Sequence, residues 1–139
     1  MSKLETPMIL AYWETTGGTL VEEFQLVSGD LECGPRRADA VIVLGANRVR
    51  LPTGERAVSL AGKDVIVVQA KASRLGMYLM GQGIFSAELL KRFGPKSIRS
   101  VILCTKDDAV LRPLLKPYSN VEVVVLEEFA IQQARPPIK

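Results

Sequence analysis

Hydrophobic residues in this chain fall into runs that predict five strands. Two runs, 38–44 and 64–71, are apolar on both faces, which is typical of central strands in a sheet covered on both sides. A third β-prone run, over 19–27, is followed by turn-forming residues. Residues 98–105 and 121–126 predict two further strands.

Three segments predict helices around these strands. Residues 6–16 carry apolar residues at near-helical spacing, with Thr6 as the expected N-cap and Pro7 at the first helical position. Residues 74–93 place a stripe of apolar and small side chains on one side and form the longest expected helix. A short helix is expected over about 107–112.

The order of these elements is α-β-β-β-α-β-α-β, which predicts an α/β fold with a mixed β-sheet flanked by helices. Residues 45–63 contain several turn residues and predict a hairpin or a long connection, with short β-like pieces around Val49 and Val58. No segment reads as an interdomain linker, so residues 1–139 are expected to form a single domain.

Composition narrows the chemistry. The 139 residues include no histidine, which excludes Ser-His-Asp and Cys-His catalysis. Cys33 and Cys104 match no Cys-x-x-Cys pattern and are expected to be reduced, half-buried thiols, without a structural zinc site. No apolar run approaches the roughly 20 residues of a membrane span, and no export signal is evident, so a cytoplasmic protein without a membrane partner is expected.

Polar residues stand at the ends of two predicted buried strands. Gln69 and Lys71 share one face at the end of the 64–71 strand, and Asp39 stands near the start of the 38–44 strand. Burial of these groups without partners is costly, so we expect them to meet one another, a metal ion or solvent at the rim of the sheet. The alternative is that both strands simply emerge into water there.

Charge is unevenly distributed along the chain, whose net charge is +3. Residues 1–30 sum to −4, whereas residues 31–60 and 71–100 sum to +2 and +5. A basic middle beside an acidic cluster suits a polyanionic partner such as DNA next to a metal site, although solvated surface charge alone would give the same totals.

Asp39, Gln69 and Lys71 form an ordered motif that resembles the PD-(D/E)XK, or restriction-endonuclease-like, nuclease superfamily. A Glu in or after the first helix is followed by Asp39 in one strand, by Gln69 and Lys71 at the end of the next, and by a long helix. The resemblance covers roughly residues 14–105. Ala38 stands where the motif often has Pro, and Gln69 replaces the usual carboxylate, as in the Mrr-like nucleases.

The resemblance implies a divalent metal site. In that superfamily the Asp, the second motif position and the main-chain carbonyl after it bind the metal. Carried over, Mg²⁺ or Mn²⁺ would be held by Asp39, Gln69 and the carbonyl of Ala70, while Lys71 would orient or activate the attacking water. Such a small ligand set suits Mg²⁺, which takes oxygen ligands and keeps several waters.

A further carboxylate is expected to compensate for Gln69. Glu14 is a candidate because the resemblance implies a metal-site Glu on the first helix. Glu22 and Glu23 are adjacent in a strand and must face opposite sides. Glu23 ranks slightly ahead because its row is more polar, whereas the row of Glu22 contains Leu20, Phe24 and Leu26. Each of the three is also explained as a solvated surface carboxylate.

Six residues are candidate contacts to nucleic acid: Arg36, Arg37, Arg48, Arg50, Arg74 and Gln82. The arginines would grip phosphates beside the site, and Gln82 would reach metal-bound waters or a phosphate from the long helix. The alternatives are ordinary surface arginines and an intramolecular hydrogen bond from Gln82.

The favoured hypothesis is a Mg²⁺-dependent endonuclease that hydrolyses phosphodiester bonds in DNA, with selectivity supplied by DNA structure, an oligomer or a partner protein. A homodimer is expected because a duplex has two strands, with strand 121–126 or the helix face carrying Met77 and Met80 as its interface. One alternative is a catalytically inactive protein of the same fold that serves as a nucleic-acid-binding or assembly module. Another is an unrelated α/β protein, which Asp39 and Lys71 on separate sheet faces would favour.

Overall fold

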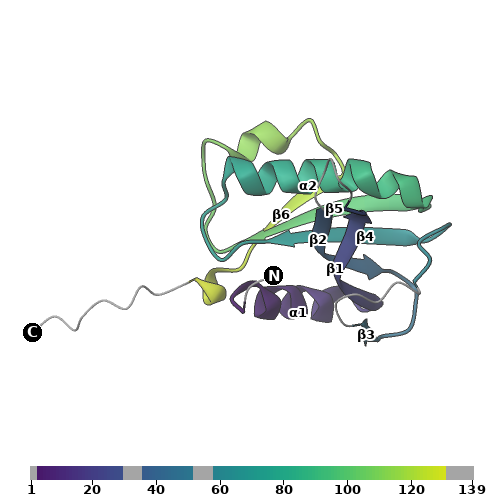
Figure 1. Cartoon of the computed structure of the whole chain (residues 1–139). Helices are drawn as coiled ribbons and strands as arrows, with labels where there is room; N and C mark the ends of the chain where they lie inside the picture. Colours follow the sequence, from purple (N-terminus) through teal and green to yellow (C-terminus); the bar gives the residue numbers. More distant parts are fainter. Residues whose placement is uncertain (1–2, 30–35, 52–57, 131–139) are drawn as a thin grey trace, which may run out of the picture.

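The computed structural model describes residues 3–29, 36–51 and 58–130. A six-stranded sheet lies between two helices, one on each face (Figure 1). The elements are α1 (Glu5–Thr16), β1 (Thr19–Val27), β2 (Arg36–Val43), β3 (Arg50–Leu51), β4 (Asp64–Ala70), α2 (Met77–Leu90), β5 (Ser97–Cys104) and β6 (Val121–Val125), with 3-10 turns at Lys91–Phe93, Arg112–Leu115 and Glu127–Phe129.

The sheet is mixed, with the strand order β3-β1-β2-β4-β5-β6. β2 pairs antiparallel with β1 and with β4, whereas β4, β5 and β6 run parallel. α2 makes the crossover from β4 to β5, because a parallel pair needs a long connection. The predicted α/β fold with a mixed sheet flanked by helices is therefore confirmed.

Each face of the sheet is covered by one helix, because the central strands are apolar on both sides. α1 buries Met8, Ile9 and Trp13 against one face, together with Ile42 and Val68 of the sheet. On the other face α2 contributes to two clusters. Its Ala87 and Leu90 pack with Val41, Val65 and Val67. Its Leu79 and Met80 pack with Ile102, Leu115 and Val123. Among the described residues, no helix combines the length and apolar character needed to cross a membrane.

The structure corrects several details of the prediction. α1 follows Leu4 and has no side-chain cap, so Thr6 lies inside the helix instead of capping it. The helix expected over 107–112 is replaced by a turn in which Asp108 Oδ1 accepts the Leu111 N–H at 2.8 Å, and a 3-10 turn follows. Cys104 is a free, fully buried thiol, whereas Cys33 lies outside the described residues.

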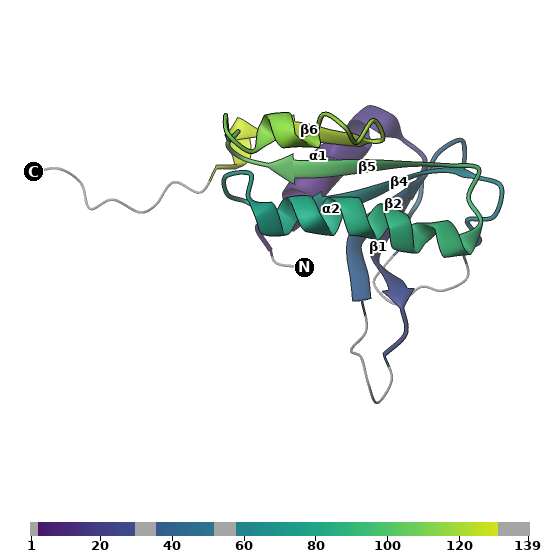
Figure 2. The ribbon, with the colours of Figure 1, turned by 90° about the horizontal axis from the view of Figure 1, so that it is seen from above.

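The β1–β2 ribbon changes its facing at Glu23, a residue that the pairing of the two strands skips. The pairs on either side are Glu22 with Ala40 and Phe24 with Ala38. Glu23 has a φ of 48°, a left-handed conformation that interrupts the regular alternation of side chains along a strand. The far ends of the ribbon project beyond the layer of α2 (Figure 2).

This change of facing overturns the predicted row of Glu22. Leu20 packs in the cluster under α1, whereas Phe24 and Leu26 pack in the cluster on the α2 side. The prediction assumed regular alternation through Glu23, and the positive φ at that residue breaks it.

Candidate active site

β2 and β4 separate at the ends that carry Asp39 and Gln69. The last paired residues of the two strands are Ala40 and Val68. Beyond them side chains bridge the gap: the Ala70 N–H donates to Asp39 Oδ2 at 2.8 Å, and the Asp39 N–H donates to Gln69 Oε1 at 3.3 Å. The two polar side chains therefore take the place of ladder hydrogen bonds where the sheet opens.

Gln69 also joins this opening to α2. Its side chain is buried, and Nε2 donates to Ser86 Oγ at 2.6 Å. Both ends of the amide are thus engaged inside the protein. As a metal ligand, Gln69 would have to use the second lone pair of an oxygen that already accepts a hydrogen bond from Asp39.

Asp39 is a half-buried carboxyl group in acidic surroundings. Burial raises the pKa of Asp39, and the Glu5 and Glu23 carboxylates raise it further, while the hydrogen bond from the Ala70 N–H acts in the opposite direction. A cation at this position would relieve the repulsion between the carboxylates.

α1 also contributes to this site, through Glu5, which no sequence pattern singles out. Glu5 Oε2 accepts the Ala72 N–H at 3.3 Å, just beyond the end of β4. Glu5 and Asp39 line the same cleft. The structure thus supplies a first-helix glutamate at the N-terminal end of α1, not at its C-terminal end.

A signal for this placement exists in the sequence. Only two glycines separate α1 from β1, and Thr19 at the start of β1 pairs with Val43 at the far end of β2 from Asp39. The C-terminal end of α1 must therefore lie away from Asp39. The N-terminal turn is about 18 Å further along a helix of this length, in the direction of the opening.

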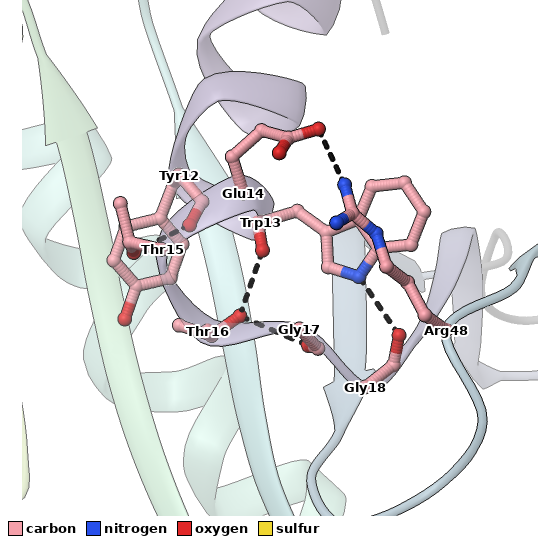
Figure 3. A network of polar contacts seen from close by, with 8 residues as sticks. All are labelled: Tyr12, Trp13, Glu14, Thr15, Thr16, Gly17, Gly18 and Arg48. Carbon is pink, nitrogen blue, oxygen red and sulfur yellow. Dashed lines mark hydrogen bonds and ion pairs between the residues drawn. The ribbon is translucent and has the colours of Figure 1, made fainter.

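Glu14 lies at that other end, in a separate polar network (Figure 3). It forms an ion pair with Arg48, whose guanidinium carbon is 5.0 Å from the centroid of the Trp13 ring. Trp13 Nε1 in turn donates to the Gly18 carbonyl oxygen at 2.9 Å. These contacts hold the α1–β1 connection, and the structure does not bring Glu14 to Asp39.

Glu22 is also engaged elsewhere. Its buried carboxylate accepts two hydrogen bonds from Arg50 of β3, at 2.7 and 3.1 Å. Of the three glutamates considered from the sequence, Glu23 is the one whose charge raises the pKa of Asp39.

Asp39 and Lys71 line one cleft of about 460 Å³. Its walls also carry Glu5, Arg74 and Gln82. Lys71 is exposed and takes no part in the ion pairs of the described residues. Arg74, in contrast, forms an ion pair in which Nη1 lies 3.9 Å from Asp108 Oδ2. The acid and the lysine of the motif therefore share one cleft and do not lie on separate faces of the sheet.

A second groove, of about 520 Å³, continues from this cleft along α2. It shares Tyr78 and Gln82 with the cleft and is bordered by Arg36 and Arg37 of β2. Four of the residues predicted to contact nucleic acid thus border one or both of these hollows, whereas Arg48 and Arg50 line neither and are paired with Glu14 and Glu22.

The donors of the cleft restrict the metal that it could take. In the described part of the chain no three His, Cys, Asp or Glu side chains are grouped so as to hold a metal ion. The oxygen donors near the opening are the Asp39 carboxylate, a second carboxylate from Glu5 or Glu23, and main-chain carbonyls. This set fits Mg²⁺, which keeps several waters, and does not fit zinc, which prefers nitrogen and sulfur ligands.

In comparisons with known proteins, no family model, no curated protein and no solved structure matches this chain. The geometry of the fold and of the site therefore describes the chain as an α/β protein that has a mixed sheet and a polar cleft where β2 and β4 separate.

Proposed function

We propose that this chain is a Mg²⁺-dependent endonuclease of the restriction-endonuclease-like fold that hydrolyses phosphodiester bonds in DNA. The observation that carries the proposal is the shared cleft of Asp39 and Lys71 at the opening of the sheet. The order of elements gives further support. The chain forms α1, then the antiparallel strands β1, β2 and β4, then α2 and the parallel strand β5, and this is the order that the resemblance to the nuclease superfamily implies.

Residues in the cleft and beside it have distinct roles in this proposal. Asp39, Glu5 and the Ala70 carbonyl, which belong to the residues that line the cleft, would hold the ion. When bound, Mg²⁺ lowers the pKa of a coordinated water and neutralises charge on the scissile phosphate. Lys71 places a positive charge beside the same phosphate. Gln69 holds the Asp39 main chain in position.

DNA cleavage tests the proposal directly. Plasmid, linear and branched DNA are incubated with the protein in Mg²⁺, Mn²⁺ or EDTA. We expect cutting that requires the metal and falls at least about 100-fold in Asp39→Asn and in Lys71→Met, since loss of one group that stabilises transition-state charge costs about this much.

The two glutamates of α1 provide a matched pair of variants. Glu5→Gln should lose activity because Glu5 lines the cleft, whereas Glu14→Gln should retain it because Glu14 lies at the other end of the helix. Equal activity in the two variants would contradict the assignment of Glu5 to the site.

A second candidate function is that of a catalytically inactive module that binds DNA. Two observations favour it: the Gln69 amide is engaged inside the protein, and the described residues lack a group of three acidic or other metal-binding side chains. This function predicts DNA binding without cutting in any metal, and no uptake of Mg²⁺ or Mn²⁺ in calorimetry. Cutting that is lost in Asp39→Asn would exclude it.

We further propose that a homodimer would use the edge strand β6. Met80 is buried in the core beneath α2, so of the two methionines predicted for a helix interface only Met77 is exposed. An edge strand presents unpaired main-chain groups that a second copy can pair with.

A further inference from the structure

Large exposed side chains lie on α2 beside the candidate active site. Met77, Tyr78 and Phe85 are 75%, 82% and 65% exposed, although the same helix buries Leu79 and Leu90. A group of large exposed side chains on one helix is typical of a binding surface. Tyr78 and Phe85 are seven residues apart, so their rings project along nearly the same line of the helix, roughly 10 Å apart.

Gly81 leaves the surface between these two rings open. A Cβ at Gly81 would meet no atom within 4 Å, whereas a Cβ at Gly83 would lie 2.7 Å from Ile102 Cδ1. Close packing thus explains Gly83 but not Gly81. Glycine is an unfavourable residue in a helix interior, so Gly81 weakens the helix and contributes open space in return.

The groove along this side of α2 is basic. Arg36 and Arg37 border it from β2, and none of its described lining residues is acidic. Through Tyr78 and Gln82 it continues into the cleft that contains Asp39 and Lys71. Aromatic rings, arginines and an open path to the cleft therefore occur along one surface.

We infer that this groove binds a single-stranded stretch of the DNA substrate; the inference rests on the proposed function. Unpaired bases stack on Tyr78 and Phe85, and Arg36 and Arg37 hold the phosphates. An exposed aromatic ring can stack on a base of any sequence, but only where the face of that base is not covered by a neighbour in a duplex. The substrate is therefore single-stranded, flapped or frayed DNA, which passes Tyr78 and Gln82 to reach the cleft.

Binding of a labelled 15-nucleotide thymidine oligomer, measured by fluorescence anisotropy in EDTA, tests this inference. The oligomer should bind more tightly than a blunt hairpin duplex of equal length. Tyr78→Ala and Phe85→Ala should each weaken its binding roughly ten-fold, since stacking of one base contributes about this much. Gly81→Leu should have a similar effect, because it fills the open surface and leaves both rings in place.

Tyr118→Ala is the matched control. Tyr118 is an exposed tyrosine that lines a different basic cleft, with Arg99 and Arg112. Its replacement should change the affinity for the thymidine oligomer less than two-fold. Urea denaturation of each variant establishes that it is folded before its affinity is compared.

Three results would overturn the inference. One is unchanged binding of the thymidine oligomer in Tyr78→Ala and Gly81→Leu, and another is a large loss in Tyr118→Ala. A third is a change of oligomeric state in sedimentation without a change in DNA affinity, which would make this face an interface between copies. Because binding in EDTA requires no cleavage, failure here is distinguishable from failure of the nuclease proposal.

Discussion

Gln69→Leu tests whether Gln69 serves as a brace between β2, β4 and α2. The substitution keeps a buried side chain of similar size but removes both hydrogen-bonding ends of the amide. The Asp39 N–H loses its acceptor at 3.3 Å, and Ser86 Oγ loses its donor at 2.6 Å. The brace hypothesis therefore predicts a loss of stability even without metal or DNA.

The size of the loss follows from the two groups left behind. A buried polar group without a partner costs about 1–3 kcal/mol. The Asp39 N–H lies near the cleft, where water can replace part of the lost contact, and the added apolar surface of leucine offsets a further part. We expect a net decrease of roughly 2–3 kcal/mol in the free energy of unfolding.

Urea denaturation at pH 7 in EDTA measures this difference. Gln82→Leu is the matched control, because Gln82 is a half-exposed glutamine of the same cleft, and its replacement should change stability by less than about 0.5 kcal/mol. Ser86→Ala should destabilise the protein on its own. The double variant with Gln69→Leu should cost less than the sum of the two, because both changes remove the same contact.

A Gln69→Leu variant as stable as the wild type would refute the brace hypothesis, as would strict additivity with Ser86→Ala. Unchanged stability combined with lost metal-dependent activity would instead support the ligand role predicted from the sequence for Gln69.

Three further predictions concern the surroundings of the site. Burial is the main cause that raises the pKa of Asp39 in the folded state, and the charges of Glu5 and Glu23 raise it further. Because the folded state then holds this proton more tightly than the unfolded state, the wild type loses stability as pH rises from the ordinary pKa of 3.8 through the raised pKa. Asp39→Asn should thus be more stable than the wild type at pH 7 in urea denaturation, with a difference that shrinks toward pH 3; a pH-independent difference would contradict this. Gly83→Ala should cost about 1–3 kcal/mol in calorimetry because of overpacking against Ile102, whereas Gly81→Ala should stabilise by up to about 1 kcal/mol, and the reverse order would be inconsistent with the two environments. Arg50→Met should lower the free energy of unfolding by about 1–2 kcal/mol because it leaves the buried Glu22 carboxylate unpaired, and a smaller cost than that of Arg48→Met would count against this reason.

The sequence predicts most of the regular structure because its strands and its long helix carry strong periodic patterns. Runs that are apolar on both faces predict β2 and β4, and the sheet that contains them is mixed and covered on both sides. Helix ends are predicted less well. α2 begins at Met77, three residues after the expected start, because Arg74 instead bridges to Lys106 beside β5.

The candidate site is predictable in part. Asp39 and Lys71 share a cleft, as the order of the motif predicts. Residue type and helix membership do not distinguish Glu5 from Glu14. The direction of α1 relative to β2, which depends on the short connection to β1, does distinguish them. The facing of Phe24 and Leu26 could not be predicted, because no pattern marks Glu23 as a residue with positive φ.

The opening between β2 and β4 is not explained by stability alone. Two apolar residues in place of Asp39 and Gln69, with a continued ladder, would avoid both a carboxylate with a raised pKa and a buried amide, and such replacements are often nearly neutral or stabilising. Asp39 accepts the Ala70 N–H through Oδ2, and this leaves Oδ1 for a ligand in the cleft. Gln69, by binding the Asp39 main chain instead of its carboxylate, fixes the residue without consuming that oxygen. Under the proposed function, this acidic opening beside the exposed Lys71 would bind a cation and a phosphate together.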